Sequence, residues 1–217
     1  MKSRPVEKTH SLARLETFSD AVIAVAITLM VLDLKPPDIT LQIQQDEFDF
    51  SFLHGYWPKL LALALSFLMI STRWLGILSY FRRVSRASLA LIWWTLLNLL
   101  AICLVPWSTA FLAEHPTLPQ AVAIYGLVGL FLLATSAPLE RHIDTEYPAP
   151  QEWNYRNTVV VAAFWGLSIP LAFVSIYLSF MIFAIVPALY IAPRKLHQRI
   201  FRPIFARLRP GSTHSRD

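Results

Sequence analysis

Cysteine is almost absent from this sequence: Cys103 is the only one among 217 residues, and it lies inside an apolar run. A single cysteine excludes an internal disulfide, and the absence of a C-x-x-C pair excludes the common zinc motifs. We therefore expect Cys103 to be a structural thiol in a helix core. No metal site and no cofactor are predicted.

Charged residues are also scarce, at 15% of the chain, against about 25% in a typical soluble domain. Apolar residues reach 55%, and the mean hydropathy is +0.49. So few charges cannot cover the surface of a small soluble domain, and so many apolar residues exclude a disordered chain. The composition therefore predicts a membrane protein.

Long apolar runs supply the membrane-spanning segments, each of which needs about 20 mostly apolar residues. Six runs predict an all-α polytopic membrane protein, with a transmembrane domain over residues 1–193 and a tail over 194–217. The expected spans are 15–34, 56–81, 88–112, 118–139, 158–175 and 178–193. Pro170 and Pro187 fall in the last two spans and are expected to kink them.

The net charge of +5 comes from an uneven distribution of basic residues. With six spans, all but two of the 19 Lys and Arg fall on the side that holds both termini, the exceptions being Lys35 and Lys59. Because Lys and Arg are enriched in cytoplasmic connections, both termini are predicted to be cytoplasmic, in a multi-pass protein of the cell inner (plasma) membrane. A five-span alternative would place the basic tail outside.

The outer side is acidic, and the tail is basic. The acidic residues in or beside the outer connections are Asp33, Asp38, Asp46, Glu47, Asp49 and Glu114. They suggest either a solvated loop or a mouth that concentrates cations. The tail places apolar residues at helical spacing among basic ones, which predicts an amphipathic segment on anionic lipids rather than nucleic-acid binding.

Signatures of catalysis are missing as well: the chain has no Gly-x-Ser-x-Gly, no His-Glu-x-x-His and no paired membrane Asp. No catalytic residue is predicted, and the protein is not expected to be an enzyme. Polar groups inside the apolar runs are candidates for function. Asn98 is expected to hydrogen-bond across a helix interface, and Arg73 to reach the membrane surface or pair with a carboxylate.

The first span begins with the motif Arg14-x-x-x-Phe18-Ser19-Asp20. This motif resembles the signature on the first helix of the transmembrane-protein-175 family of potassium channels. Chain length and span number also fit, as does the stretch Leu97-Asn98-Leu99-Leu100 followed by Val105-Pro106-Trp107. The resemblance covers roughly residues 14–112 by motif and the remainder only by topology.

The resemblance implies a homotetramer in which the four first helices line a central pore, with potassium as the permeant ion. It implies no filter loop, and no Thr-Val-Gly-Tyr-Gly stretch occurs. The implied constriction is Val25, with further apolar rings at Leu29 and Leu32, and this i, i+4, i+7 spacing shares one helix face. Thr28 is on the same side, where its hydroxyl would replace part of a cation's hydration shell.

One departure from the family concerns the second span. Relatives usually carry histidines after a Trp like Trp74, but no His occurs here between His54 and His115. Our hypothesis is that Arg73 or Tyr80 contacts the signature carboxylate instead. The candidate bracing residues are Arg73, Trp74 and Asn98.

The function expected from these features is a potassium-permeable cation channel that conducts passively through an apolar constriction, which serves as filter and gate. Two alternatives stay open. A secondary transporter would use helices broken at prolines such as Pro106, although the later spans lack the buried acids of a coupling site. A membrane scaffold would conduct nothing.

Overall fold

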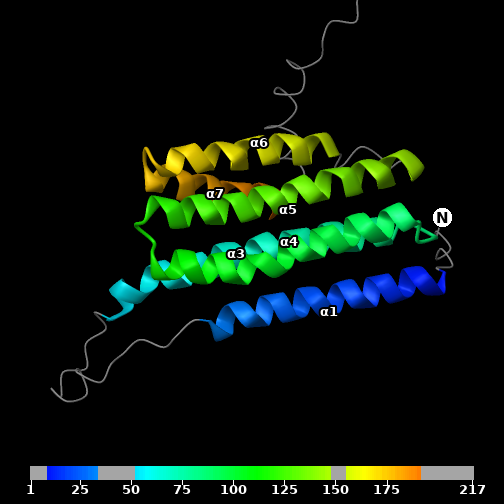
Figure 1. The fold of residues 1–217 in the computed structure, drawn as a ribbon, viewed down its shortest axis with the longest axis horizontal. Coiled ribbons are helices and arrows are strands. Elements are labelled where there is room, and N and C mark those ends of the chain that lie inside the picture. Colours follow the sequence, from blue (N-terminus) through cyan, green and yellow to red (C-terminus); the bar gives the residue numbers. More distant parts are fainter. Residues whose placement is uncertain (1–8, 34–51, 148–154, 192–217) are drawn as a thin grey trace, which may run out of the picture.

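The computed structural model describes residues 9–33, 52–147 and 155–191, and within these ranges the protein is all-α (Figure 1). The basic tail and most of the acidic outer connection lie outside them. The helices are α1 (His10–Leu32), α3 (Phe52–Phe81), α4 (Leu89–Glu114), α5 (Pro119–Glu146), α6 (Tyr155–Ala172) and α7 (Ile176–Ile191).

Four of these helices, α1, α3, α4 and α5, are long and apolar enough to cross a membrane. The last two are apolar but shorter, and they are separated at residues 173–175. The starts of α4 and α5 follow from local chemistry. Ser88 caps α4 by accepting a hydrogen bond from the Leu91 amide at 3.2 Å, and Pro119 occupies the first turn of α5, where its missing N–H costs nothing.

Figure 1 shows α1 at one edge of a helical slab, with α3 and α4 beside it and α5, α6 and α7 beyond them. Accordingly, α1 packs on α4 and α3, whereas α5 packs on α4 and α6. The Thr9 amide donates to the Ser85 carbonyl at 3.2 Å, and Arg83 pairs with Asp144 at 2.8 Å. The start of α1, the α3–α4 turn and the end of α5 therefore lie at the same end of the subunit.

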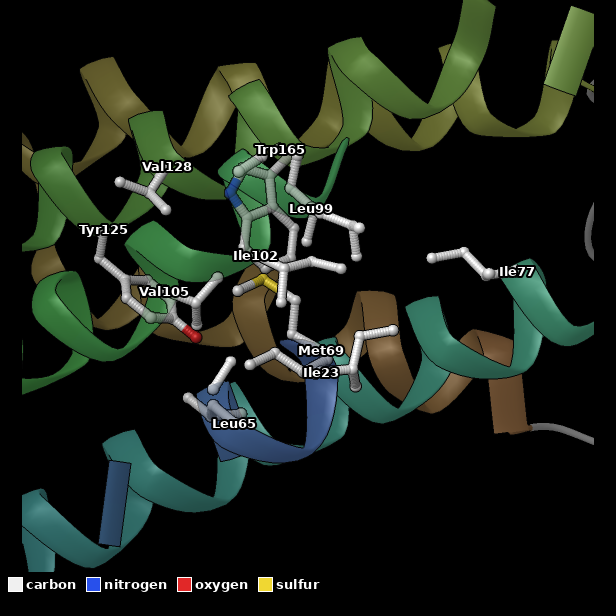
Figure 2. Close-up of a cluster of buried hydrophobic side chains, with 14 of the residues drawn as sticks. Ile23, Leu65, Met69, Ile77, Leu99, Ile102, Val105, Tyr125, Val128 and Trp165 are labelled. Carbon is white, nitrogen blue, oxygen red and sulfur yellow. The ribbon is translucent and has the colours of Figure 1, made fainter. Parts of the chain in front are cut away.

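The apolar core contains buried side chains from all six helices. Figure 2 shows Ile23 of α1 lying with Leu65 and Met69 of α3, and Trp165 and Tyr125 on the opposite side of the cluster. Trp165, Tyr125 and Phe183 interlock their rings, with centroids 4.9–6.4 Å apart. Because lipid is as apolar as this core, such close packing rather than exclusion of water holds the helices together.

Gly129 of α5 permits the closest helix approach. A methyl group built on Gly129 would overlap the indole of Trp165, which is only 2% exposed and has no free space beside it. We expect Gly129→Ala to lower the free energy of unfolding by about 2–3 kcal/mol, the usual cost of overpacking. Thermal unfolding in detergent would measure this. Gly166→Ala is the matched control, since its methyl group would meet only Leu130, at 3.8 Å; equal stability of the two variants would contradict the prediction.

Candidate functional site

Helix α1 has two distinct faces. The face packed on the bundle is buried, at Leu12, Leu15, Ser19, Ile23, Ala26 and Met30. The opposite face carries the apolar stripe formed by Val25, Leu29 and Leu32, whose side chains are 56%, 45% and 77% exposed. Thr28 is exposed beside this stripe and donates its hydroxyl hydrogen to the Val25 carbonyl at 2.9 Å. The Thr28 oxygen therefore keeps its lone pairs available to a cation.

The signature residues are divided between the same two faces. Ser19 is fully buried, and its hydroxyl donates to the Leu15 carbonyl of the same helix at 2.8 Å. Arg14 and Phe18 point outward and are exposed. Asp20, although exposed, is held by α3, because the Trp74 indole N–H donates to its carboxylate at 2.9 Å. Trp74 is therefore the side chain that ties the signature to the rest of the subunit.

The prediction that Arg73 or Tyr80 contacts the Asp20 carboxylate is wrong, because Trp74 makes that contact. In the structure, Arg73 turns away from α1. Its Nη1 forms a salt bridge with Glu140 of α5 at 3.0 Å, and its Nε donates to Asn98 at 2.9 Å. The Tyr80 ring lies 5.6 Å below the guanidinium as a cation–π partner. Arg73 thus pairs with a carboxylate, but with a different one.

Asn98 is the hub of this polar cluster. Its side-chain oxygen accepts from Arg73. Its amide nitrogen lies 2.8 Å from the Thr135 hydroxyl, 3.0 Å from the Ser136 hydroxyl and 3.1 Å from the Leu132 carbonyl. The second oxygen of Glu140 accepts from Thr158 of α6. Every one of these groups is buried, and hydrogen bonding replaces most of the solvation that they have lost. The Nη2 of Arg73 is the exception, since it has no hydrogen-bond partner within the described residues.

Glu140 is the residue that the sequence reading misses. The expected fourth span ends at Leu139, since Pro138 and the charged residues after it suggest a boundary, yet α5 continues to Glu146 and buries Glu140 to 1% exposure. One signal was available in the sequence. Leu132, Ser136 and Glu140 recur every four residues, so a helix continuing through Pro138 would place all three on one face.

A shallow apolar groove runs between α1 and α4 beside the stripe, with a volume of about 290 Å³. It is lined by Ala21, Val22, Val25, Ala26, Leu29, Cys103 and Pro106. Cys103 is exposed in this groove rather than packed in a core, which corrects the expectation for the thiol. Among the described residues, no group of three or more His, Cys, Asp or Glu is arranged to hold a metal ion.

Helix α1 carries an outward apolar stripe, and a buried polar cluster links α3, α4, α5 and α6. Helices of this length and composition define a multi-pass α-helical membrane protein. The family model described as endosomal/lysosomal potassium channel TMEM175 matches residues 14–106. A potassium channel of Streptomyces collinus is 33% identical over 174 residues, covering 75% of this chain and 82% of that protein. The chain belongs to the TMEM175 family.

Two further matches come from Chamaesiphon minutus. A potassium channel of Chamaesiphon minutus is 40% identical over 120 residues, which is 55% of this chain and 58% of that protein. The crystal structure of a lysosomal potassium-selective channel TMEM175 homolog from Chamaesiphon minutus superposes with a TM-score of 0.72 at 27% identity, and the match covers 84% of this chain and 97% of that one. The bundle described above is therefore the fold of a TMEM175 channel subunit.

Proposed function

We propose that this protein is a potassium-permeable cation channel that conducts passively through a central pore lined by α1. The observation that carries the proposal is the exposed apolar stripe of Val25, Leu29 and Leu32, on a helix that opens with the family signature. Hydrophobic rings select ions by forcing partial dehydration, and they gate by dewetting. The relatives named above are potassium channels, and a channel family is not an enzyme class.

The orientation we propose places the start of α1 in the cytoplasm. Arg14, Arg82, Arg83, Arg86 and Arg141 all lie at or near the end of the subunit where α1 starts, the α3–α4 turn lies and α5 ends. Excess Lys and Arg mark the cytoplasmic side of an inner membrane. With six crossings, the carboxyl-terminal tail is on the same side, where its basic residues would contact anionic lipids.

The opposite end is proposed to be the outer mouth. Asp33 directly follows α1, and Glu114 ends α4, so these two acidic residues lie at the end away from the basic cluster. Negative charge at a pore entrance raises the local concentration of cations. Potassium ions would then meet Leu32, Leu29 and Val25 in that order on the way inward.

A homotetramer is the assembly that we propose. Among the four long helices α1 is the least buried, at 28% of its apolar segment against 56% for α5. A single subunit therefore leaves most of α1 without a protein partner, as expected for a helix shared between a pore and neighbouring subunits. The groove between α1 and α4 is floored by Ala21 and Ala26, and such small residues let another helix approach closely.

Filling the groove tests this assembly. Cys103→Trp places a bulky ring where the neighbouring subunit would pack, and overpacking of this kind costs about 1–3 kcal/mol at each interface. We expect the purified tetramer to dissociate toward monomers, measured by light scattering in detergent. Leu167→Trp is the control, because Leu167 is 52% exposed on α6, far from α1. Dissociation of both variants, or of neither, would argue against the groove as the interface.

The decisive experiment is a recording from purified protein in a planar bilayer with potassium on one side and sodium on the other. Discrete currents with a reversal potential toward potassium equilibrium are expected. Gradient-driven uptake that saturates with substrate would instead indicate a secondary transporter. The absence of any current or uptake would indicate a non-conducting scaffold.

A further inference from the structure

Two sets of polar contacts meet at consecutive residues of α3 and together involve five of the six described helices. The first set starts at Asp20 on α1, which accepts from Trp74 on α3. The neighbouring residue on α3, Arg73, reaches Asn98 on α4 and Glu140 on α5. Glu140 then accepts from Thr158 on α6. Through α3, α1 is thus connected to α5 and α6 as well as to α4, on which it packs directly.

The two contacts made by α3 depend on each other because their residues are consecutive. Successive side chains of an α-helix are separated by 100° around its axis, since the helix has 3.6 residues per turn. Trp74 faces α1, and Arg73 faces α4 and α5. The rotation of α3 that aims the guanidinium at Glu140 therefore also fixes where the Trp74 indole meets Asp20.

The burial of Glu140 and its ion pair with Arg73 suit it to hold α3 in one position. It is 1% exposed, and its ion pair with Arg73, itself 8% exposed, has an N–O distance of 3.0 Å. Charges inside a membrane protein are costly, and those that persist are commonly tied to function. A buried ion pair contributes little net stability compared with apolar packing, and the best supported use of such a pair is to fix register.

We propose that Glu140 is a positioning residue for ion conduction: it fixes Arg73, and through the rotation of α3 it fixes the Trp74–Asp20 hydrogen bond and the angle at which α1 presents its apolar stripe. Glu140 does not touch the permeant ion. This inference rests on the proposed channel function, because its readout is the potassium current.

The first arm of the test compares two substitutions on α5 that remove the same charge. Glu140→Gln keeps the shape but removes the negative charge that pairs with Arg73, and so weakens the hold of α5 on the guanidinium. We expect potassium flux per reconstituted channel to fall about three- to tenfold, which is within the range of coupling changes along such networks. Glu146→Gln lies at the exposed end of the same helix and is expected to leave the flux unchanged. Equal flux in Glu140→Gln and the unaltered protein overturns the inference.

The second arm is a double-mutant cycle with Trp74→Phe, which removes the donor to Asp20. If Glu140 acts through α3 and Trp74, then adding Glu140→Gln to Trp74→Phe should lower the flux by less than about twofold further, since one pathway is already broken. A structural role alone would give two independent reductions that multiply. Multiplying effects therefore overturn the inference, and a plateau supports it.

A third variant covers the case in which Glu140→Gln does not fold. Arg73→Leu/Glu140→Leu removes both charges together, which buried pairs commonly tolerate, and it removes the anchor of α3 as well. Its flux is expected to fall about three- to tenfold; a folded double variant with full flux overturns the inference. If the unaltered protein carries no potassium current, the channel function and the inference are both overturned. If the unaltered protein conducts, the variants test the role of Glu140 alone.

Discussion

Arg73→Leu is expected to remove most of the folded protein, because it leaves the Glu140 carboxylate buried without its cation. Glu140 is 1% exposed, so no solvent replaces the lost ion pair. Breaking a buried pair from one side costs about 3–5 kcal/mol, a large part of the stability of most domains. The measurement is the yield of monodisperse protein after detergent extraction, together with its thermal unfolding temperature.

Two variants make this prediction specific. Arg82→Leu removes an exposed arginine from the end of the same helix and should cost within about 0.5 kcal/mol, as surface changes usually do. Arg73→Leu/Glu140→Leu should recover most of the lost stability, because neither charge is then stranded. If the double variant is as unstable as Arg73→Leu, the damage comes from lost packing rather than from the orphaned carboxylate.

Val25→Asn is expected to raise the permeability of sodium relative to potassium by about tenfold. An apolar ring offers a dehydrated ion no ligands to replace its water. In the proposed tetramer, four Asn side chains would offer amide oxygens that coordinate the ion, which helps sodium more because sodium is more strongly hydrated. A difference of about 1.4 kcal/mol between the two ions corresponds to a factor of ten. Val25→Ala should act in the same direction by widening the ring. The reversal potential in mixed potassium and sodium measures both.

The control for the pore is Val31→Asn, the same substitution on the same helix. Val31 is 58% exposed, almost equal to the 56% of Val25, but it lies on another face of α1. Val25→Ile, which narrows the ring, is expected to lower sodium permeability. An unchanged reversal potential in Val25→Asn, or an equal change in Val31→Asn, would place the constriction elsewhere.

The helices can be predicted from the sequence because an apolar run consists of consecutive residues and does not depend on tertiary contacts. A long stretch without charge must be helical in a membrane, since no water is present to satisfy its backbone. Family membership, proposed from the motif of residues 14–20, is confirmed by the family model and by the relatives. The assignment of Val25, Thr28, Leu29 and Leu32 to a pore stays a prediction.

The sequence predicts only part of the polar cluster, because the pairing of its residues depends on which helices are neighbours. Arg73 and Asn98 were conspicuous as polar groups within apolar runs, but nothing in their spacing says that α5 lies against both. Glu140 was hidden by its surroundings: it follows Pro138 and precedes Arg141 and His142, so it resembles a residue of a hydrated boundary. Only tertiary packing makes it a buried partner.

The hydrogen bonds that hold α1 to its neighbours lie in its first half. Thr9 is tied to Ser85, and Asp20 to Trp74, whereas the second half has mainly apolar contacts, apart from a long 4.0 Å approach of the Thr109 hydroxyl to Met30. Thermal tilting of α1 would therefore pivot about its first half. Since Leu32 lies roughly 10 Å beyond Val25 along the axis, the same tilt moves Leu32 much farther than Val25. In the proposed pore, selection at Val25 would then stay constant while the outer ring opens and closes.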